Sequence, residues 1–77
     1  MAVLVSAPPE IDPAALRARR ETIGASRQQV AVAAGVSLRT VERAERGEAK
    51  PRPVVAAALA SALGVKVDAL VREVERR

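Results

Sequence analysis

Apolar residues recur every three or four positions along most of the chain after residue 12, which is the period of an amphipathic α-helix. No stretch alternates apolar and polar positions as a half-buried strand does, and Val is the only abundant strand former. Before residue 13 the helical period is missing, and Pro8 and Pro9 stand in the segment. The pattern therefore predicts an all-α, compact domain over residues 13–77, preceded by an extended arm over residues 1–12.

Capping residues divide the predicted domain into five helices. Asp12 and Pro13 mark the start of the first helix, because Asp is a good N-cap and Pro suits the first helical position. Ser26 caps the second helix, and Gln29 three residues later completes a capping box. The third helix follows Ser37 and runs to residue 46, and the fourth opens at residue 53. Glycines 24, 35, 47 and 64 end these four, and a fifth helix is expected from about residue 67.

Composition narrows the classes of function. The chain has no Cys, no His and no aromatic residue, which excludes thiol catalysis, disulfides, the common zinc sites and aromatic stacking of bases. Apolar residues are 49% of the sequence and 17 of them are Ala, which fits a packed helical domain and not a disordered one. No nucleophile–base pair, metal set or glycine-rich phosphate loop is present. We therefore expect neither an enzyme nor a cofactor or metal.

The charge of the chain is concentrated in its middle. Residues 16–52 contain nine Arg or Lys against four acids, within a net charge of +4. Eleven of the thirteen basic residues are Arg, the side chain best suited to phosphate and guanine recognition, although a GC-rich genome raises Arg as well. A basic centre in a small domain favours a nucleic-acid partner. No apolar run has the length of a membrane span, and Met1–Val5 is too short for a signal peptide, so a cytoplasmic location without membrane contact is expected.

The segment from Arg27 to Arg46 has the requirements of a helix-turn-helix. Ala31 supplies a small residue where the two helices touch, and Gly35 supplies a turn residue that tolerates positive φ. The apolar anchors are Val30, Val36, Val41 and Ala44, and the outer face of the second helix is Leu38, Arg39, Glu42, Arg43 and Arg46. The alternative interpretation is two ordinary amphipathic helices with a solvated charged face.

The run S-R-Q-Q-V-A-V-A-A-G-V-S-L-R-T-V-E-R-A-E-R-G resembles the helix-turn-helix of Cro and phage-repressor type regulators. The likeness extends to residues 16–24 and to the run A-L-A-S-A-L-G-V-K-V-D-A-L, so that it covers residues 16–70. It implies a five-helix, lambda-repressor-like DNA-binding domain. The sequence departs from the family pattern where Arg27 replaces the usual Gln, Ala25 replaces Leu, Ala44 replaces a larger apolar residue, and Lys66 replaces a capping Ser or Thr.

The resemblance also implies roles for single residues. It places Leu38, Arg39 and Arg43 at the base edges of the major groove, where Arg can bind guanine and Leu can touch a thymine methyl group. It assigns phosphate contacts to Ser26 and Arg27 at the start of the second helix, and to Thr40, Arg46, Lys50 and Arg52. Each of these cations is otherwise read as a solvated surface charge.

Two charged residues face inward in this pattern. Arg20 lies on the same helical face as Leu16 and Ile23, where a lone charge would be expensive. The family commonly pairs an Arg of the first helix with a Glu near the end of the third, which implies a partly buried ion pair between Arg20 and Glu45. Glu21, Glu42 and Glu48 are interpreted as solvated charges.

The resulting hypothesis is a sequence-specific regulator of transcription, repressor-like, from a bacterium or phage, which binds double-stranded DNA as a homodimer. The dimer contact is expected on the fifth helix through Val67, Leu70, Val71 and Val74, with the arm as its rival. The alternative hypothesis is an antitoxin that binds a partner toxin protein as well as DNA, with Met1–Val5 and the Pro8-Pro9 stretch as the partner-binding segment.

Overall fold

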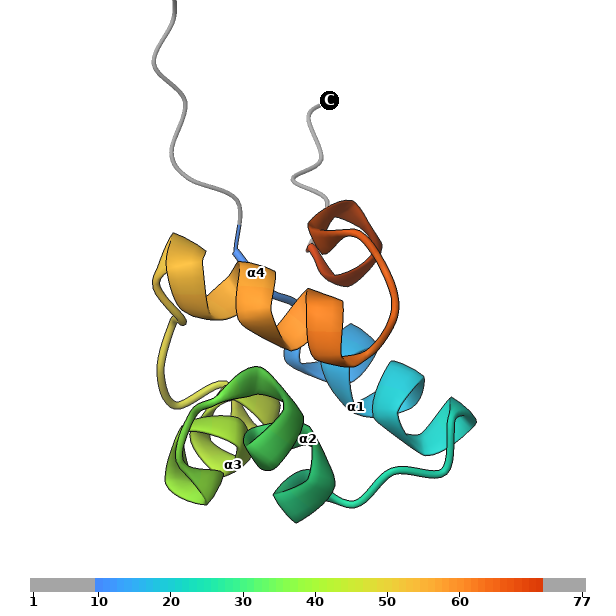
Figure 1. Cartoon of the computed structure of the whole chain (residues 1–77). Coiled ribbons are helices and arrows are strands. Elements are labelled where there is room, and N and C mark those ends of the chain that lie inside the picture. The colour runs from blue at the N-terminus through green and yellow to red at the C-terminus, as the bar shows by residue number, and fades with distance from the viewer. Residues whose placement is uncertain (1–9, 72–77) are drawn as a thin grey trace, which may run out of the picture.

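A computed structural model describes residues 10–71 of the chain, and within them four α-helices and one 3-10 helix surround a common core (Figure 1). The α-helices are α1 (Pro13–Thr22), α2 (Arg27–Ala34), α3 (Leu38–Arg46) and α4 (Pro53–Ala62). The 3-10 helix, η1, spans Val67–Leu70. The compact all-helical fold predicted from the sequence is therefore present.

Side-chain caps define where the first three helices begin, as the sequence predicted. The Asp12 carboxylate accepts from the backbone N–H of Ala14 at 3.2 Å. Ser26 Oγ accepts from the N–H of Gln29 at 3.0 Å, and Gln29 Oε1 accepts from the N–H of Ser26 at 2.8 Å, which completes the capping box. Ser37 Oγ accepts from the N–H of Thr40 at 3.1 Å. These bonds satisfy backbone donors that a helix start leaves open.

The turn between α2 and α3 places the two helices against each other. Gly35 has a φ of +72°, the left-handed conformation that a residue without a Cβ adopts at low cost. The backbone N–H of Val36 then donates to the carbonyl of Ala31 at 3.0 Å and closes the end of α2. Ala31 is buried, so its small side chain occupies the point where the helices meet. The predicted helix-turn-helix is thus formed.

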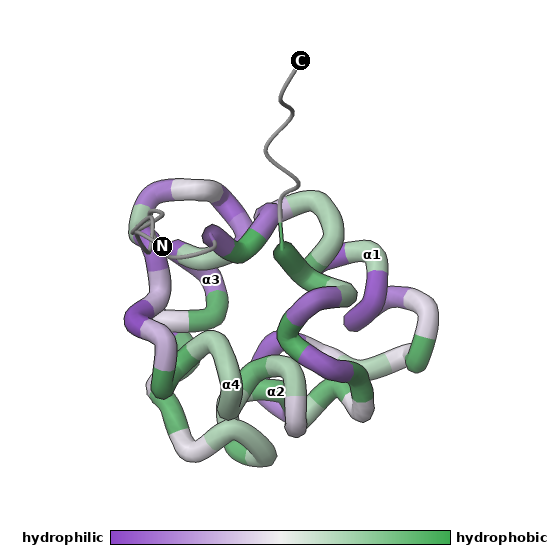
Figure 2. Tube along the Cα trace, turned by 90° about the horizontal axis from the view of Figure 1, so that it is seen from above, coloured by the Kyte–Doolittle hydropathy of each residue, from purple (hydrophilic) through white to green (hydrophobic). Residues whose placement is uncertain are grey.

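The core lies between α4 and the other helices. α2 packs against both α3 and α4, while α1 packs against α3 and η1. The largest fully buried side chains are Leu16, Val41, Leu59, Leu63 and Leu70. Figure 2 shows α4 mostly in green because this helix has no charged residue. The core holds α3 so that its charged side faces outward.

The prediction of a fifth α-helix from about residue 67 is wrong for the residues that the structure describes, because residues 67–70 form the four-residue η1 and not an α-helix. Lys66 provides no capping bond to start a longer helix, and after Leu70 the backbone becomes extended and bridges Ile11 at Val71. The N–H of Asp12 also donates to the carbonyl of Leu70 at 2.7 Å. Pairing with residues 11 and 12 therefore ends the helical conformation at Leu70.

The same pairing changes the expected arm. Ile11 is buried and belongs to the core, so the part of the arm that the structure describes is fixed to the domain. The segments Met1–Val5 and Pro8-Pro9, on which the antitoxin alternative depends, lie outside the described residues, as does Val74. Ile23 was expected on the inner face of the first helix but is 43% exposed, because it follows the last turn of α1.

Candidate nucleic-acid interface

The outer face of α3 presents long polar side chains to solvent. Arg39 and Arg46 are exposed, Glu42 and Arg43 are half-buried, and Leu38 is 37% exposed. The inner face of the same helix buries Val41 and Ala44 against the core. α3 is therefore strongly amphipathic, and its outer face is available to a partner.

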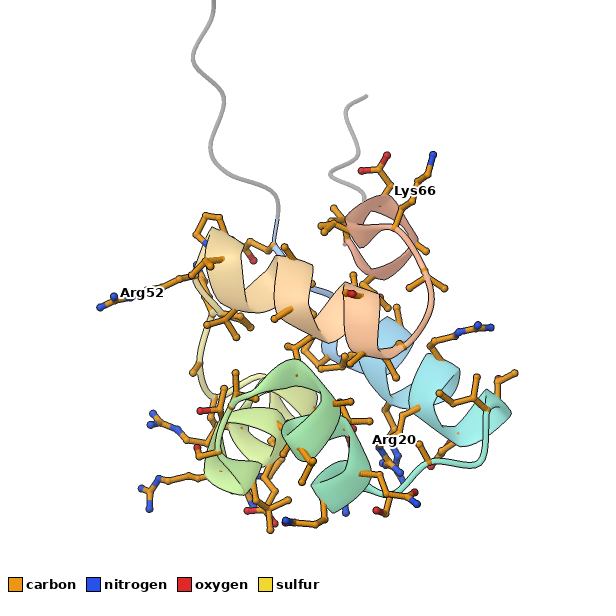
Figure 3. The ribbon with its side chains drawn as sticks, in the orientation of Figure 1. Arg20, Arg52 and Lys66 are labelled. Atoms are coloured by element: carbon orange, nitrogen blue, oxygen red, sulfur yellow. The ribbon has the colours of Figure 1, made fainter. Side chains whose placement is uncertain are left out.

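A surface pocket joins α3 to the loop that follows it. It has a volume of about 230 Å³ and is lined by Arg39, Thr40, Arg43 and Ala44 of α3, by residues 49–52, and by Val55 of α4. The pocket thus brings together five of the site residues proposed from the sequence, namely Arg39, Thr40, Arg43, Lys50 and Arg52. Figure 3 shows Arg52 extending away from the body of the domain. Four cations around one opening favour an anionic partner.

Several of the side chains proposed as phosphate contacts also have partners within the domain. Ser26 caps α2, and Thr40 Oγ1 lies 2.9 Å from Ser37 Oγ. Arg46 Nε lies 3.2 Å from Glu48 Oε2, and Lys50 Nζ lies 3.1 Å from Glu10 Oε2. Both ion pairs are largely exposed, and pairs of this kind contribute about 0–1 kcal/mol, so a phosphate can replace the carboxylate.

The structure brings Arg20 and Glu45 into a buried ion pair. Arg20 Nη2 donates to Glu45 Oε1 at 3.0 Å, Arg20 Nε donates to the other carboxylate oxygen, and Arg20 Nη1 donates to the carbonyl of Ala25 at 3.0 Å. The Arg20 side chain is 10% exposed and that of Glu45 is 3% exposed. In Figure 3 Arg20 points from α1 toward the segment before α2. One guanidinium therefore joins α1, the start of α2 and the end of α3.

Arg27 is a third member of this cluster. Its Nε donates to Glu45 Oε1 at 3.0 Å, although its side chain remains 44% exposed. Sequence reasoning missed this contact, because the two residues are 18 positions apart and no local spacing indicates the pairing. The departure from the family pattern at Arg27, an Arg in place of Gln, was the one signal that could have found it. Arg27, which was predicted to contact a phosphate, thus also forms an ion pair within the domain.

The ion-pair cluster changes the pKa values of both Arg20 and Glu45. The hydrogen bond to Glu45 raises the pKa of Arg20 beyond its ordinary value, although burial opposes this. Burial would raise the pKa of Glu45, but hydrogen bonds and attraction from Arg20, and then from Arg27, outweigh it and hold that pKa below its ordinary value. Both groups are therefore charged near neutral pH.

Two other features were sought in the described residues, a metal-ligand cluster and a membrane-spanning helix. Between residues 10 and 71, no three His, Cys, Asp or Glu side chains gather in a way that could hold a metal ion. Over the same range, no helix has the length and apolar character needed to cross a membrane.

A family profile described as a helix-turn-helix domain matches residues 14–74. The chain belongs to this helix-turn-helix family. Its solved relatives are regulators of the Cro and phage-repressor type, which agrees with the resemblance seen in the sequence. A comparison with curated protein sequences found no match.

Three solved structures illustrate the similarity. The restriction-modification controller protein C.AhdI from Aeromonas hydrophila has 28% identity and a TM-score of 0.72, over 74% of this chain and 86% of that chain. The DNA-binding domain of the P22 C2 repressor has 26% identity and a TM-score of 0.72, over 80% and 82%. The clp gene regulator ClgR from Corynebacterium glutamicum has 32% identity and a TM-score of 0.70; 73% of this chain aligns with 60% of that chain. The three are named as a controller protein, the DNA-binding domain of a repressor and a gene regulator, so the chain is similar to proteins that regulate genes.

Proposed function

We propose that this protein is a sequence-specific regulator of transcription that binds double-stranded DNA with α3 in the major groove. The observation that carries this proposal is the outer face of α3, where Arg39 and Arg43 stand beside the pocket formed with the loop of residues 49–52. Arg can donate two hydrogen bonds to O6 and N7 of guanine, and Leu38 can contact a thymine methyl group.

Backbone contacts on both sides of α3 would fix its position in the groove. At the start of α2, the Ser26–Arg27 segment presents a helix N-terminus and a half-exposed guanidinium to one phosphate. After α3, Lys50 and Arg52 present cations to a second phosphate, with Thr40 and Arg46 between the two. Such contacts orient the protein without reading sequence.

We further propose that the protein acts as a homodimer and represses by covering a promoter. A single helix-turn-helix contacts few base pairs, so two copies would read a pseudo-palindrome whose half-site centres lie about 10–10.5 bp apart. The dimer contact would use Val67 and Val71, which are partly exposed. Leu70 was predicted to share this dimer contact, but it is 1% exposed and packs in the core of the monomer, so its side chain is not available to a second copy.

The direct test is selection of duplexes from a randomised library by the purified chain at one stated salt concentration. The proposal expects enrichment of a sequence with two-fold symmetry, whose affinity exceeds that for random duplex by roughly 10³-fold or more. Equal affinity for selected and random duplexes would show that binding carries no sequence information, and absence of any binding would reject the DNA partner.

The dimer is tested separately by sedimentation and by comparing single with paired half-sites. Val67→Glu places a charge in the proposed contact and should abolish cooperative binding to paired half-sites while single half-sites still bind. Deletion of residues 1–10 is the matched test of the arm. Loss of cooperativity only in the deletion would move the interface to the arm, and a wild type without cooperativity would reject the dimer.

A further inference from the structure

Glu42 lies on the outer face of α3 and is half-buried. With 3.6 residues per turn, Glu42 lies about 40° around the helix from Leu38 and about 60° from Arg39 in the other direction. It is therefore placed between two of the residues proposed to touch bases, and not at the margin of the face. An acidic group there is repelled by the phosphates of an approaching nucleic acid. Binding is therefore weakened unless the carboxylate gains a favourable contact that offsets the repulsion.

The arginines beside Glu42 do not supply that contact. Arg27, Glu42 and Arg46 together line a second pocket, of about 140 Å³. Arg27 Nε is bonded to Glu45 at 3.0 Å, and Arg46 Nε is bonded to Glu48 at 3.2 Å. Within residues 10–71 the Glu42 carboxylate forms no hydrogen bond or ion pair.

Binding to DNA would change the surroundings of the Glu42 carboxylate. When α3 enters a major groove it displaces water from its outer face, and a carboxylate left there without a donor is costly. The hydrogen-bond donors that bases present in the major groove are the amino groups N4 of cytosine and N6 of adenine. The other polar positions, N7, O6 and O4, are acceptors and repel a carboxylate. The chemistry that satisfies Glu42 is thus an exocyclic amino group.

We propose that Glu42 accepts a hydrogen bond from the exocyclic amino group of a cytosine or an adenine and so determines the base preferred at one position of the binding site. This inference rests on the proposed function, because it requires α3 in the major groove. Glu42 also acts by rejection, because guanine or thymine at that position turns an acceptor toward the carboxylate.

The test compares Glu42→Ala with Glu48→Ala, which removes the same charge from the turn after α3 and outside its outer face. Both variants and the wild type select duplexes from one randomised library at one salt concentration. The wild type and Glu48→Ala should share a position occupied by cytosine or adenine, and Glu42→Ala should accept any base there. Both variants should bind random duplex slightly more tightly, because each removes one repulsive charge. Identical selected sites for all three proteins would overturn the proposal.

A second measurement identifies the amino group. At the position found, cytosine is replaced by pyrimidin-2-one, or adenine by purine, each of which lacks only the exocyclic amino group. Wild-type affinity should fall by about tenfold, while the affinity of Glu42→Ala should not change. An equal loss in both proteins would show that another residue reads the base. A wild type that selects no sequence would refute the proposed function together with this inference, whereas strong selection unchanged in Glu42→Ala refutes this inference alone.

Discussion

On the inner side of α3 the charge of Glu45 is buried and paired, whereas the charges on the outer side are exposed or half-buried and, apart from the exposed pair of Arg46 with Glu48, have no ion-pair partner among residues 10–71. On the inner side, Glu45 is almost fully buried and accepts from two arginines. On the outer side and in the adjoining loop, Arg39, Arg43 and Arg52 form no ion pair with any residue between 10 and 71. One helix thus holds charges of two kinds.

The two kinds of charge should respond differently to substitution. A buried charge without its partner is expensive, so the inner side should determine whether the domain folds. Exposed charges contribute little to folding, so the outer side is free to bind an anionic partner. Mutations that separate stability from DNA binding test this division.

The largest effect is expected for Glu45→Gln. It removes the partner of Arg20 inside the domain, and breaking a buried pair costs about 3–5 kcal/mol. For a small domain whose stability is on the order of 5 kcal/mol, much of the protein should unfold. Thermal melts followed by circular dichroism measure the loss, with Glu48→Gln as the control in an exposed pair. A melting temperature of Glu45→Gln close to that of the wild type would contradict the structural role of the pair.

A smaller effect, and on a different property, is expected for Arg39→Ala and Arg43→Ala. Each should weaken binding to the selected duplex by roughly 1–3 kcal/mol and relax the preference at one base position. Stability should change by less than about 0.5 kcal/mol, because both side chains lie on the outer face. Titrations with selected and random duplexes measure the two affinities, and equal weakening on both would remove these residues from the base-reading role.

Lys50→Ala and Arg52→Ala should act more weakly and without regard to sequence. Each removes one proposed phosphate contact, so the slope of log affinity against log salt should become shallower by about 1. Lys50 has Glu10 as a competing partner and Arg52 has no carboxylate partner in the described residues, so Arg52→Ala should cost more. Binding isotherms over a range of salt test this, and an unchanged slope would exclude both residues from phosphate contact.

The last prediction concerns the pH dependence of stability that Glu45 contributes. Its pKa in the folded chain is held below the ordinary value, so the unfolded chain binds the proton more tightly. The stabilisation is therefore present above the ordinary pKa of about 4.3 and is lost as the pH falls through the lower, folded value. Urea unfolding of wild type and Glu45→Gln between about pH 6 and pH 3 should show their stabilities converging at acid pH. A constant difference would show that Glu45 is not the titrating group.

Local signals in the sequence were sufficient for much of the fold. Asp12, Ser26 and Ser37 predicted three helix starts, because capping depends on residues three or fewer positions away. The fifth helix was mispredicted, since the pairing of Ile11 with Val71 joins the two ends of the described chain and leaves no local signal. The contact of Arg27 with Glu45 was missed for the same reason.

The grouping of the candidate site residues could be predicted from the sequence in outline. The pocket beside α3 gathers Arg39, Arg43, Lys50 and Arg52, which the resemblance to the family had already selected. The lack of an ion-pair partner for Glu42 among the described residues could not be predicted from the sequence. It depends on which carboxylates pair with the neighbouring arginines, and that is decided by how the helices pack.

The outer face of α3 is the surface that we propose meets the DNA. An NMR titration of the isotope-labelled chain with the selected duplex is the sharpest test of this contact, because it reports on every backbone amide at once. The largest chemical-shift changes are expected in α3, in residues 49–52 and at the start of α2, with little change on the outer side of α4. Changes concentrated on α4 or η1, with α3 unaffected, would contradict it.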